Sequence, residues 1–240
     1  MEAIIKKDEF EKEVITDLET LSERCDEIDV RKQASLVQEI VLGLKATLRA
    51  HKENAVALAA NQIGYNYRIF VIRFGENDYR TFINPIITNA KGLTLNKESC
   101  LSIPGKEYIR PRNTEIEVMY QTPLGKAESR KMFGLAAFVF QHELDHLDGL
   151  NVSDIGLEID DDFRNASEEE QNQLLDKYLE ALDLKQKELK EEIDNDEELK
   201  QQSDAIDFMQ SVIKGETILG ETISETKREH EEKKAKKGDK

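Results

Sequence analysis

Apolar residues recur at spacings of three and four between residues 10 and 51, which predicts α-helix. The polar run from Asp26 to Asp29 interrupts this pattern, so two helices are expected. The periodic apolar positions are Val14, Ile15, Leu18 and Leu21, followed by Leu36, Ile40, Val41 and Leu44.

The pattern changes to that of a β-sheet after a run of small residues that ends near residue 62. Residues 69–72 are short, β-branched and aromatic, as expected of a buried strand. Further strands are predicted at 81–83, 86–88, 115–120 and 126–132. Between the last two, the sequence Thr-Pro-Leu-Gly is typical of a hairpin turn.

Residues 134–147 return to a helical pattern. Their apolar face runs from Leu135 and Phe138 through Val139 to His142 and His146. We therefore expect a central, buried helix that carries two histidines into the interior.

The chain after residue 165 has a different character. Ser167 and Glu170 have capping-box spacing and predict the start of an amphipathic helix that ends near Glu191. Residues 191–202 and 226–240 are too polar to fold by burial, with a weak apolar patch at 212–213 and 218–219 between them. We predict a core domain over 1–165 and an acidic, helical and partly disordered tail over 166–240. The apolar face of the tail helix comprises Leu174, Leu175, Tyr178, Leu179 and Leu182.

Composition narrows the class of protein. Residues 166–240 carry 22 Asp and Glu against 13 Lys and Arg, and residues 1–165 carry 28 against 21. Because both parts are acidic, no specific nucleic acid is expected as a partner. Two cysteines cannot build a disulfide framework, and no stretch resembles a signal peptide or a membrane span. The expectation is a soluble, cytoplasmic protein with no membrane partner.

The sequence His142-Glu143-Leu144-Asp145-His146 has the HExxH spacing, which places two imidazoles one helical turn apart with a glutamate beside them. Such a pair usually shares a metal ion with a third protein ligand. A charged surface helix is the simpler interpretation, but the apolar residues that flank the motif favour a buried site.

Three positions are candidates for the third ligand. Val152 occupies the place of the third histidine in the metzincin pattern and cannot bind metal. The glutamates at 168–170 lie near the place of a thermolysin-like ligand, but in a solvated cluster. Cys100 is the better candidate, although taken alone it would more often be a buried core thiol.

Three motifs together resemble those of peptide deformylases. The chain has ESCLS at 98–102, HELDHLDG at 142–149 and AVALAANQ at 55–62, in the order in which that family carries EGCLS, HExDHLxG and GxGLAAxQ. The segment Phe-Ile-Asn-Pro at 82–85 resembles the strand before the family's cysteine, and the likeness covers about residues 30–155. It implies an α+β fold in which an N-terminal helix packs on mixed, mainly antiparallel sheets around a buried metal-ligand helix. It also makes 1–165 a deformylase-like catalytic domain.

The resemblance assigns roles to individual residues. It makes Cys100, His142 and His146 the ligands of one divalent metal, with Fe(II) expected first and Zn(II), Ni(II) or Co(II) as alternatives. Glu143 would be the general base, while the Gln62 amide and the Leu101 backbone N–H would hold the oxyanion. Around the metal ligands it places three supporting residues, Glu98, Arg112 and Asp145, of which the last two would form an ion pair. The substrate-binding residues that it implies are Val56, Ala57, Ser99, Leu135, Phe138 and Val139.

Four positions depart from the family pattern. Ala55, Ala57 and Ser99 stand where the motifs have glycine, so their side chains could crowd a substrate backbone. Phe138 is bulkier than the aliphatic side chain expected there, which predicts a shorter or reshaped pocket for methionine.

The implied substrates and partners are nascent formyl-methionyl polypeptides. Two rival interpretations remain: an HExxH metallopeptidase with another third ligand, and a non-catalytic binding module in which the metal is structural and the acidic tail recruits a partner. The lysine-rich end, residues 233–237, predicts either a solvated terminus or a transient contact with the ribosome.

Overall fold

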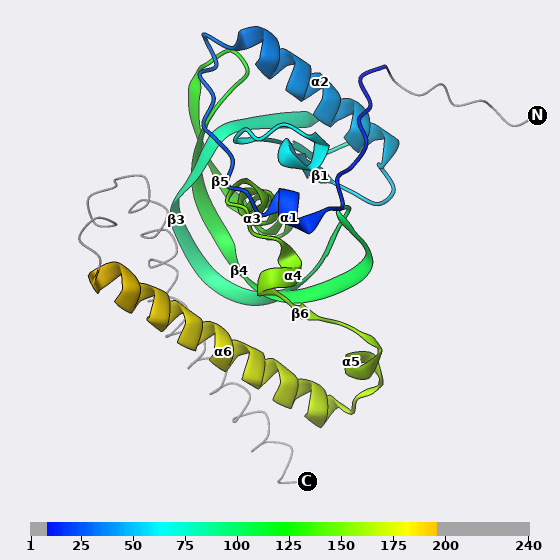
Figure 1. Cartoon of the computed structure of the whole chain (residues 1–240), viewed down its shortest axis with the longest axis vertical. Helices are drawn as coiled ribbons and strands as arrows, with labels where there is room; N and C mark the ends of the chain where they lie inside the picture. Colours follow the sequence, from blue (N-terminus) through cyan, green and yellow to red (C-terminus); the bar gives the residue numbers. More distant parts are fainter. Residues whose placement is uncertain (1–8, 196–240) are drawn as a thin grey trace, which may run out of the picture.

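The computed structural model describes residues 9–195 of the 240-residue chain. Its centre is one strongly curved sheet that wraps around a single helix, α3 (Leu135–Leu147) (Figure 1). The five strands of the main path follow one another in sequence, and every paired strand in residues 9–195 is antiparallel. The α+β architecture predicted from the sequence is confirmed, with one continuous sheet in place of several. The strands are β1 (Ala57–Ala59), β2 (Ile69–Arg73), β3 (Tyr79–Cys100), β4 (Ile103–Gln121), β5 (Ala127–Phe133) and β6 (Leu157–Glu158), which pairs with β4.

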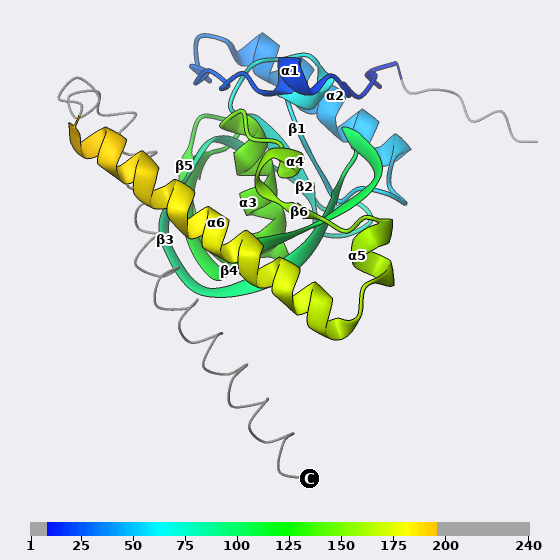
Figure 2. The same ribbon diagram turned by 60° about the horizontal axis from the view of Figure 1, so that its bottom comes forward.

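The long hairpin of β3 and β4 forms most of the curved wall (Figures 1 and 2). Predicted strands at 81–83 and 86–88 are parts of β3, and that at 115–120 is part of β4. The pairing register shifts three times along this hairpin, the last time between Glu98 and Cys100. Because an irregularity of this kind bends and twists a strand, the hairpin curls around α3 and can aim alternate side chains at it.

Aromatic rings fill the space between α3 and the sheet. The ring of Phe140 on α3 meets those of Phe70 and Phe82 edge-on, with centroids 5.0 and 5.3 Å apart, and all three side chains are fully buried. The helix predicted at 134–147 is confirmed, and its first residue follows Gly134. The rings fix the height and rotation of α3, because bulky groups packed in rigid contact leave few alternative positions.

The N-terminal region differs from the sequence prediction. The second predicted helix is present as α2 (Ala34–Ala50), which packs with β1 and β2 in a second core cluster. The first is almost absent, since only α1 (Leu18–Leu21) is helical. In the segment before α1, backbone N–H groups donate to residues distant in sequence: the N–H of Lys12 to Thr47 Oγ1 at 2.9 Å, and that of Ile15 to the Gln62 carbonyl at 2.9 Å. The segment before α1 is thus held by tertiary hydrogen bonds in place of helical ones.

The chain after the core continues through α4 (Val152–Ile155) and α5 (Asp161–Asn165) into α6 (Glu168–Asn195). The predicted capping box is present, with Ser167 N donating to Glu170 Oε2 at 2.8 Å and Glu170 N donating to Ser167 Oγ at 3.3 Å. In both views α6 crosses the outside of the sheet near β4 (Figures 1 and 2).

The predictions for residues 196–202, 212–219 and 226–240 lie outside the described residues, and the division at residue 165 stays a prediction. No helix within residues 9–195 is long and apolar enough to cross a membrane.

Gly149 holds the end of α3 against the N-terminal segment. Its φ is +74°, and a β-carbon there would lie 2.5 Å from the Ser22 carbonyl oxygen. We expect Gly149→Ala to lower the free energy of unfolding by about 2 kcal/mol or more, because left-handed strain and overpacking act together. The matched control is Gly105→Ala: Gly105 has φ +78° but no atom within 4 Å of an added β-carbon. Equal losses in urea unfolding of the two variants would contradict the role of the Ser22 contact.

Candidate metal centre

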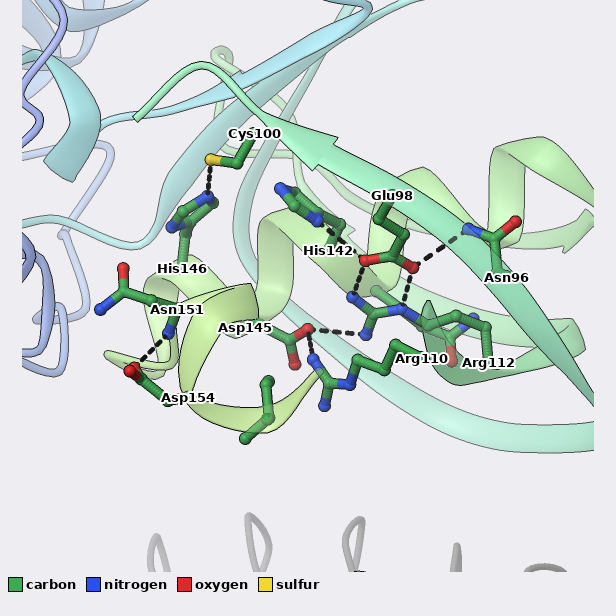
Figure 3. A network of polar contacts seen from close by, with 12 residues as sticks. Asn96, Glu98, Cys100, Arg110, Arg112, His142, Asp145, His146, Asn151 and Asp154 are labelled. Carbon is green, nitrogen blue, oxygen red and sulfur yellow. Dashed lines mark hydrogen bonds and ion pairs between the residues drawn. The ribbon is translucent and has the colours of Figure 1, made fainter. Parts of the chain in front are cut away.

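Three side chains from two elements converge inside the curved sheet. Cys100 ends β3, and His142 and His146 lie one turn apart on α3. One ligand atom from each lies within 4.8 Å of those of the other two, and Cys100 Sγ is 3.2 Å from His146 Nε2 (Figure 3). Within residues 9–195 this is the one such group of three His, Cys, Asp or Glu side chains. The structure thus brings together the three predicted ligands.

The ring nitrogens of His142 have separate partners. Its Nδ1 lies 3.1 Å from Glu98 Oε2, while Nε2 points toward Cys100 (Figure 3). A carboxylate on one nitrogen fixes the ring orientation and leaves the other nitrogen as a lone-pair donor. One thiolate and two imidazoles suit a divalent transition metal, so the donor set fits the ion that the sequence predicts.

The other two candidates for the third metal ligand do not join this group. Val152 is buried in a small apolar cluster with Cys100. Residues 168–170 begin α6, and Glu170 is engaged in the capping box with Ser167.

A network of ion pairs holds the metal-ligand side chains in place. Arg112 on β4 donates to both carboxylate oxygens of Glu98, at 2.6 and 2.7 Å, and to Asp145 Oδ2 at 2.6 Å. The Arg112 side chain is only 3% exposed. The network therefore joins β3, β4 and α3, and the contact expected between Arg112 and Asp145 is present.

Sequence reasoning missed Arg110. Its Nη1 atom also donates to Asp145 Oδ2 (Figure 3). Arg110 and Arg112 are two residues apart on one strand and so share a face, which was the signal available in the sequence. Asn96 was also missed; its Nδ2 donates to Glu98 Oε1 at 3.1 Å.

The neighbouring charges shift the pKa values of the site residues. Burial alone would raise the pKa of Cys100, but hydrogen bonds from His142 and His146 lower it to about 5. Burial would lower the pKa of His142, but its bonds to Cys100 and Glu98 raise it to about 10. Burial also opposes ionisation of Glu98, yet Arg112 and His142 hold its pKa well below the usual range. These contacts thus favour the thiolate form of Cys100 and a positive charge beside it.

Glu143 stands apart from this network. Its side chain is 4% exposed, and Oε2 has no hydrogen-bond partner within residues 9–195. Burial raises its pKa to about 7, against the opposing effect of the two histidines. A buried carboxyl whose pKa lies near 7, and one of whose oxygens has no hydrogen-bond partner, is suited to accept and return a proton.

Gln62 lies in the 3₁₀ turn η1 (Asn61–Ile63), beside Cys100. Its Oε1 accepts the Ala59 N–H at 2.9 Å, so the amide nitrogen must face the site. That Nε2 is 3.0 Å from Ser102 Oγ and 3.5 Å from Cys100 Sγ. Leu101 follows Cys100 in the two-residue turn between β3 and β4.

The predicted substrate residues lie on three segments. Ala57 begins β1 and Val56 directly precedes it, Ser99 is exposed on β3, and the others are on α3. Leu135 is 70% exposed, so it does not belong to the buried face of α3 that the sequence predicted for it. Phe138 is half-buried, and Val139 packs against the core. Their roles toward substrate stay predictions.

Comparison with known proteins gives one family. The profile of the family described as Polypeptide deformylase matches residues 12–156. A peptide deformylase from Dictyoglomus turgidum is 36% identical over 141 residues, which cover 59% of this chain and 87% of the relative. One from Treponema pallidum is 38% identical over 136 residues, covering 55% and 78%.

Solved structures of the same kind share the fold. A class I type b peptide deformylase from Acinetobacter baumannii aligns with a TM-score of 0.55 at 23% identity, over 60% of this chain and 97% of that one. The enzyme from the Vibrio parahaemolyticus bacteriophage VP16T aligns with a TM-score of 0.53 at 32% identity, over 58% and 98%.

The two buried cysteines allow a direct test of the metal centre. We expect Cys100→Ala to weaken metal binding by more than about 100-fold, because loss of an outer contact alone costs 10–100-fold. Cys25→Ala removes a buried thiol that is outside the centre and should retain the metal. Metal content after dialysis against a chelator, measured by mass spectrometry, compares the two. Metal retained by Cys100→Ala would exclude the thiolate as a ligand.

Proposed function

The chain belongs to the polypeptide deformylase family of enzymes, which act on N-formyl peptides, and we propose that it hydrolyses the formyl group from N-formylmethionyl polypeptides in a metal-dependent reaction. Water adds to the formyl carbon, the C–N bond breaks, and the products are formate and a free N-terminal amine. The observation that carries the proposal is the buried carboxyl of Glu143, whose Oε2 has no hydrogen-bond partner in the described residues, beside the group of Cys100, His142 and His146.

The three ligands would hold one divalent metal, for which Fe(II) is our first choice and Zn(II), Ni(II) or Co(II) are alternatives. When bound, such an ion supplies Lewis-acid activation of water. The protein contributes the anionic thiolate of Cys100 and the fixed ring of His142, whose Nδ1 is held by Glu98.

Glu143 acts in this proposal as the general base and then as the general acid. Its carboxylate takes the proton from the attacking water and delivers it to the departing amine nitrogen, which leaves with both electrons of the broken bond. A pKa raised to about 7 by burial supports both steps, because the two forms are then similarly populated near neutrality.

Gln62 and Leu101 would stabilise the negative charge that develops on the formyl oxygen. The Gln62 amide nitrogen already faces Cys100 Sγ, and its orientation is fixed by the N–H of Ala59. A donor held in place before the reaction loses little energy to reorganisation, so it favours the transition state. The backbone N–H of Leu101, next to the ligand Cys100, is the second proposed donor.

Two alternatives have less support. A metallopeptidase would need a third ligand other than Cys100, and within residues 9–195 no second such group of ligands occurs. A binding module with a structural metal has no use for the buried, unpaired Glu143.

The proposed partners are nascent formyl-methionyl chains in the cytoplasm. Transient contact with the ribosome through residues 233–237 stays a prediction, since those residues lie outside the described part of the chain.

Glu143→Ala tests the reaction. We expect formate release from formyl-Met-Ala-Ser to fall about 100- to 10,000-fold, as when a general base is lost, while the metal content stays near that of the wild type. Protein purified without oxygen guards against oxidation of the metal and the thiolate. Glu169→Gln, an exposed position in the first turn of α6, serves as the control and should keep full activity. Unchanged formate release by Glu143→Ala would exclude its role.

Phe138→Ile tests the methionine pocket. If Phe138 shortens the pocket, the smaller side chain should raise the ratio of kcat/KM for formyl-methionyl over formyl-alanyl peptides by about tenfold. Phe133→Ile, at an exposed position just before α3, is the matched control and should leave the ratio unchanged. An equal ratio in all three proteins would show that Phe138 does not limit the pocket.

A further inference from the structure

One carboxylate oxygen in the support network receives two guanidinium groups. Asp145 Oδ2 is the acceptor for Nη1 of Arg110 and for Nη1 of Arg112, which donates at 2.6 Å (Figure 3). Asp145 lies between the two metal-ligand histidines in the sequence of α3. Its contacts therefore act on the same helical turn that presents both imidazoles.

Arg112 has more than one carboxylate to satisfy. Two of its nitrogens donate to the two oxygens of Glu98 at 2.6 and 2.7 Å, and a third reaches Asp145. With Arg112 alone, the carboxylates of Glu98 and Asp145 would share one cation. Arg110 supplies the second cation, so the four side chains are neutral as a group. Neutrality matters here because an unpaired buried charge is strongly destabilising.

The environment of Arg110 makes this pairing effective. Its side chain is 18% exposed and that of Asp145 is 17% exposed, so little water screens them. Burial and the neighbouring Arg112 lower the pKa of Arg110, in keeping with a dry site.

Helix α6 lies outside the residues matched to the family, and it is also close to this network. The Tyr178 hydroxyl donates to the Ile155 carbonyl at 2.7 Å, which anchors α6 to α4. Leu179 beside it is buried. Burial raises the pKa of Tyr178 to about 12, and the charges of Arg110 and Arg112 lie near enough to act on it. The tail helix thus lies near the two arginines of the network.

We propose that Arg110 is a positioning residue of the metal centre: by neutralising Asp145 it leaves Arg112 free to hold Glu98, and Glu98 in turn holds the ring of His142. After the contact between Arg110 and Asp145, three further contacts lead to the metal ligand: 2.6 Å from Asp145 to Arg112, 2.7 Å from Arg112 to Glu98 and 3.1 Å from Glu98 to His142. The proposal rests on the metal centre, and it does not depend on which reaction the centre performs.

Cobalt(II) binding to the full-length, metal-free protein tests the proposal. Competition with a chromophoric chelator gives the affinity, and the thiolate-to-cobalt absorption band reports the geometry at Cys100. We expect Arg110→Met to weaken cobalt binding about 10- to 100-fold and to shift the band, as loss of an outer contact does. Arg110→Lys, which keeps the charge, should recover part of the affinity. Unchanged affinity and band in Arg110→Met would overturn the proposal.

A control and a double mutant separate positioning from general stability. Lys106→Met removes another cation of β4, one paired with Glu158 at 2.9 Å on the surface, and should leave cobalt affinity unchanged. In an Asp145→Asn background, Arg110→Met should add little, because its partner is already neutral. A full additional loss there would overturn the proposed path through Asp145.

Folding and function are measured beside these titrations. Far-UV circular dichroism and urea unfolding of each metal-free variant show whether it is folded; if Arg110→Met is not, Arg110→Gln takes its place in the same titrations. Formate release is assayed separately. Cobalt affinity that falls as expected in a protein without deformylase activity would support the role of Arg110 and contradict the proposed function, so the two failures are distinguishable.

Discussion

The contact between Glu98 and His142 is the interaction on which the rest of the structure depends. Its 3.1 Å approach commits Nδ1 of the imidazole and turns Nε2 toward Cys100. Glu98 and Cys100 are two residues apart on the same strand, so one segment supplies both a ligand and the group that orients another. Residues two apart on a strand share a face, so the two side chains can both point toward α3.

The Glu98 carboxylate can be buried beside His142 only because neighbouring cations neutralise its charge. Glu98 is buried, and an isolated buried charge would be costly. Two arginines on β4 and Asp145 on α3 complete a neutral group that ties the strand hairpin to the ligand helix. The charges that support the metal centre therefore also hold two elements of the fold together, so stability and metal binding share the same residues.

The remaining packing sets where α3 lies within the sheet. Phe140 is wedged between aromatic rings of β2 and β3, and Gly149 lets the chain after α3 pass close to the Ser22 carbonyl. Neither residue approaches the chemistry, yet each limits how far the ligand helix can slide or rotate. The unpaired carboxyl of Glu143 depends on this rigidity, because a looser site would admit water and lower its pKa.

The sequence by itself determined the features that depend on neighbours along the chain. The spacing of His142 and His146 on one helix, the capping box at Ser167 and the Thr-Pro-Leu-Gly turn all follow from local geometry, and the joint motifs indicated Cys100. Tertiary structure decided the rest. The segment before α1 forms hydrogen bonds with residues distant in sequence in place of helical ones. The short strands that were predicted separately are parts of one long, bent hairpin. The role of Arg110 could be inferred only from the packing of β4 against α3, which brings it to Asp145. The free energy of a buried charge is set by its neighbours in space, and sequence periodicity does not encode these.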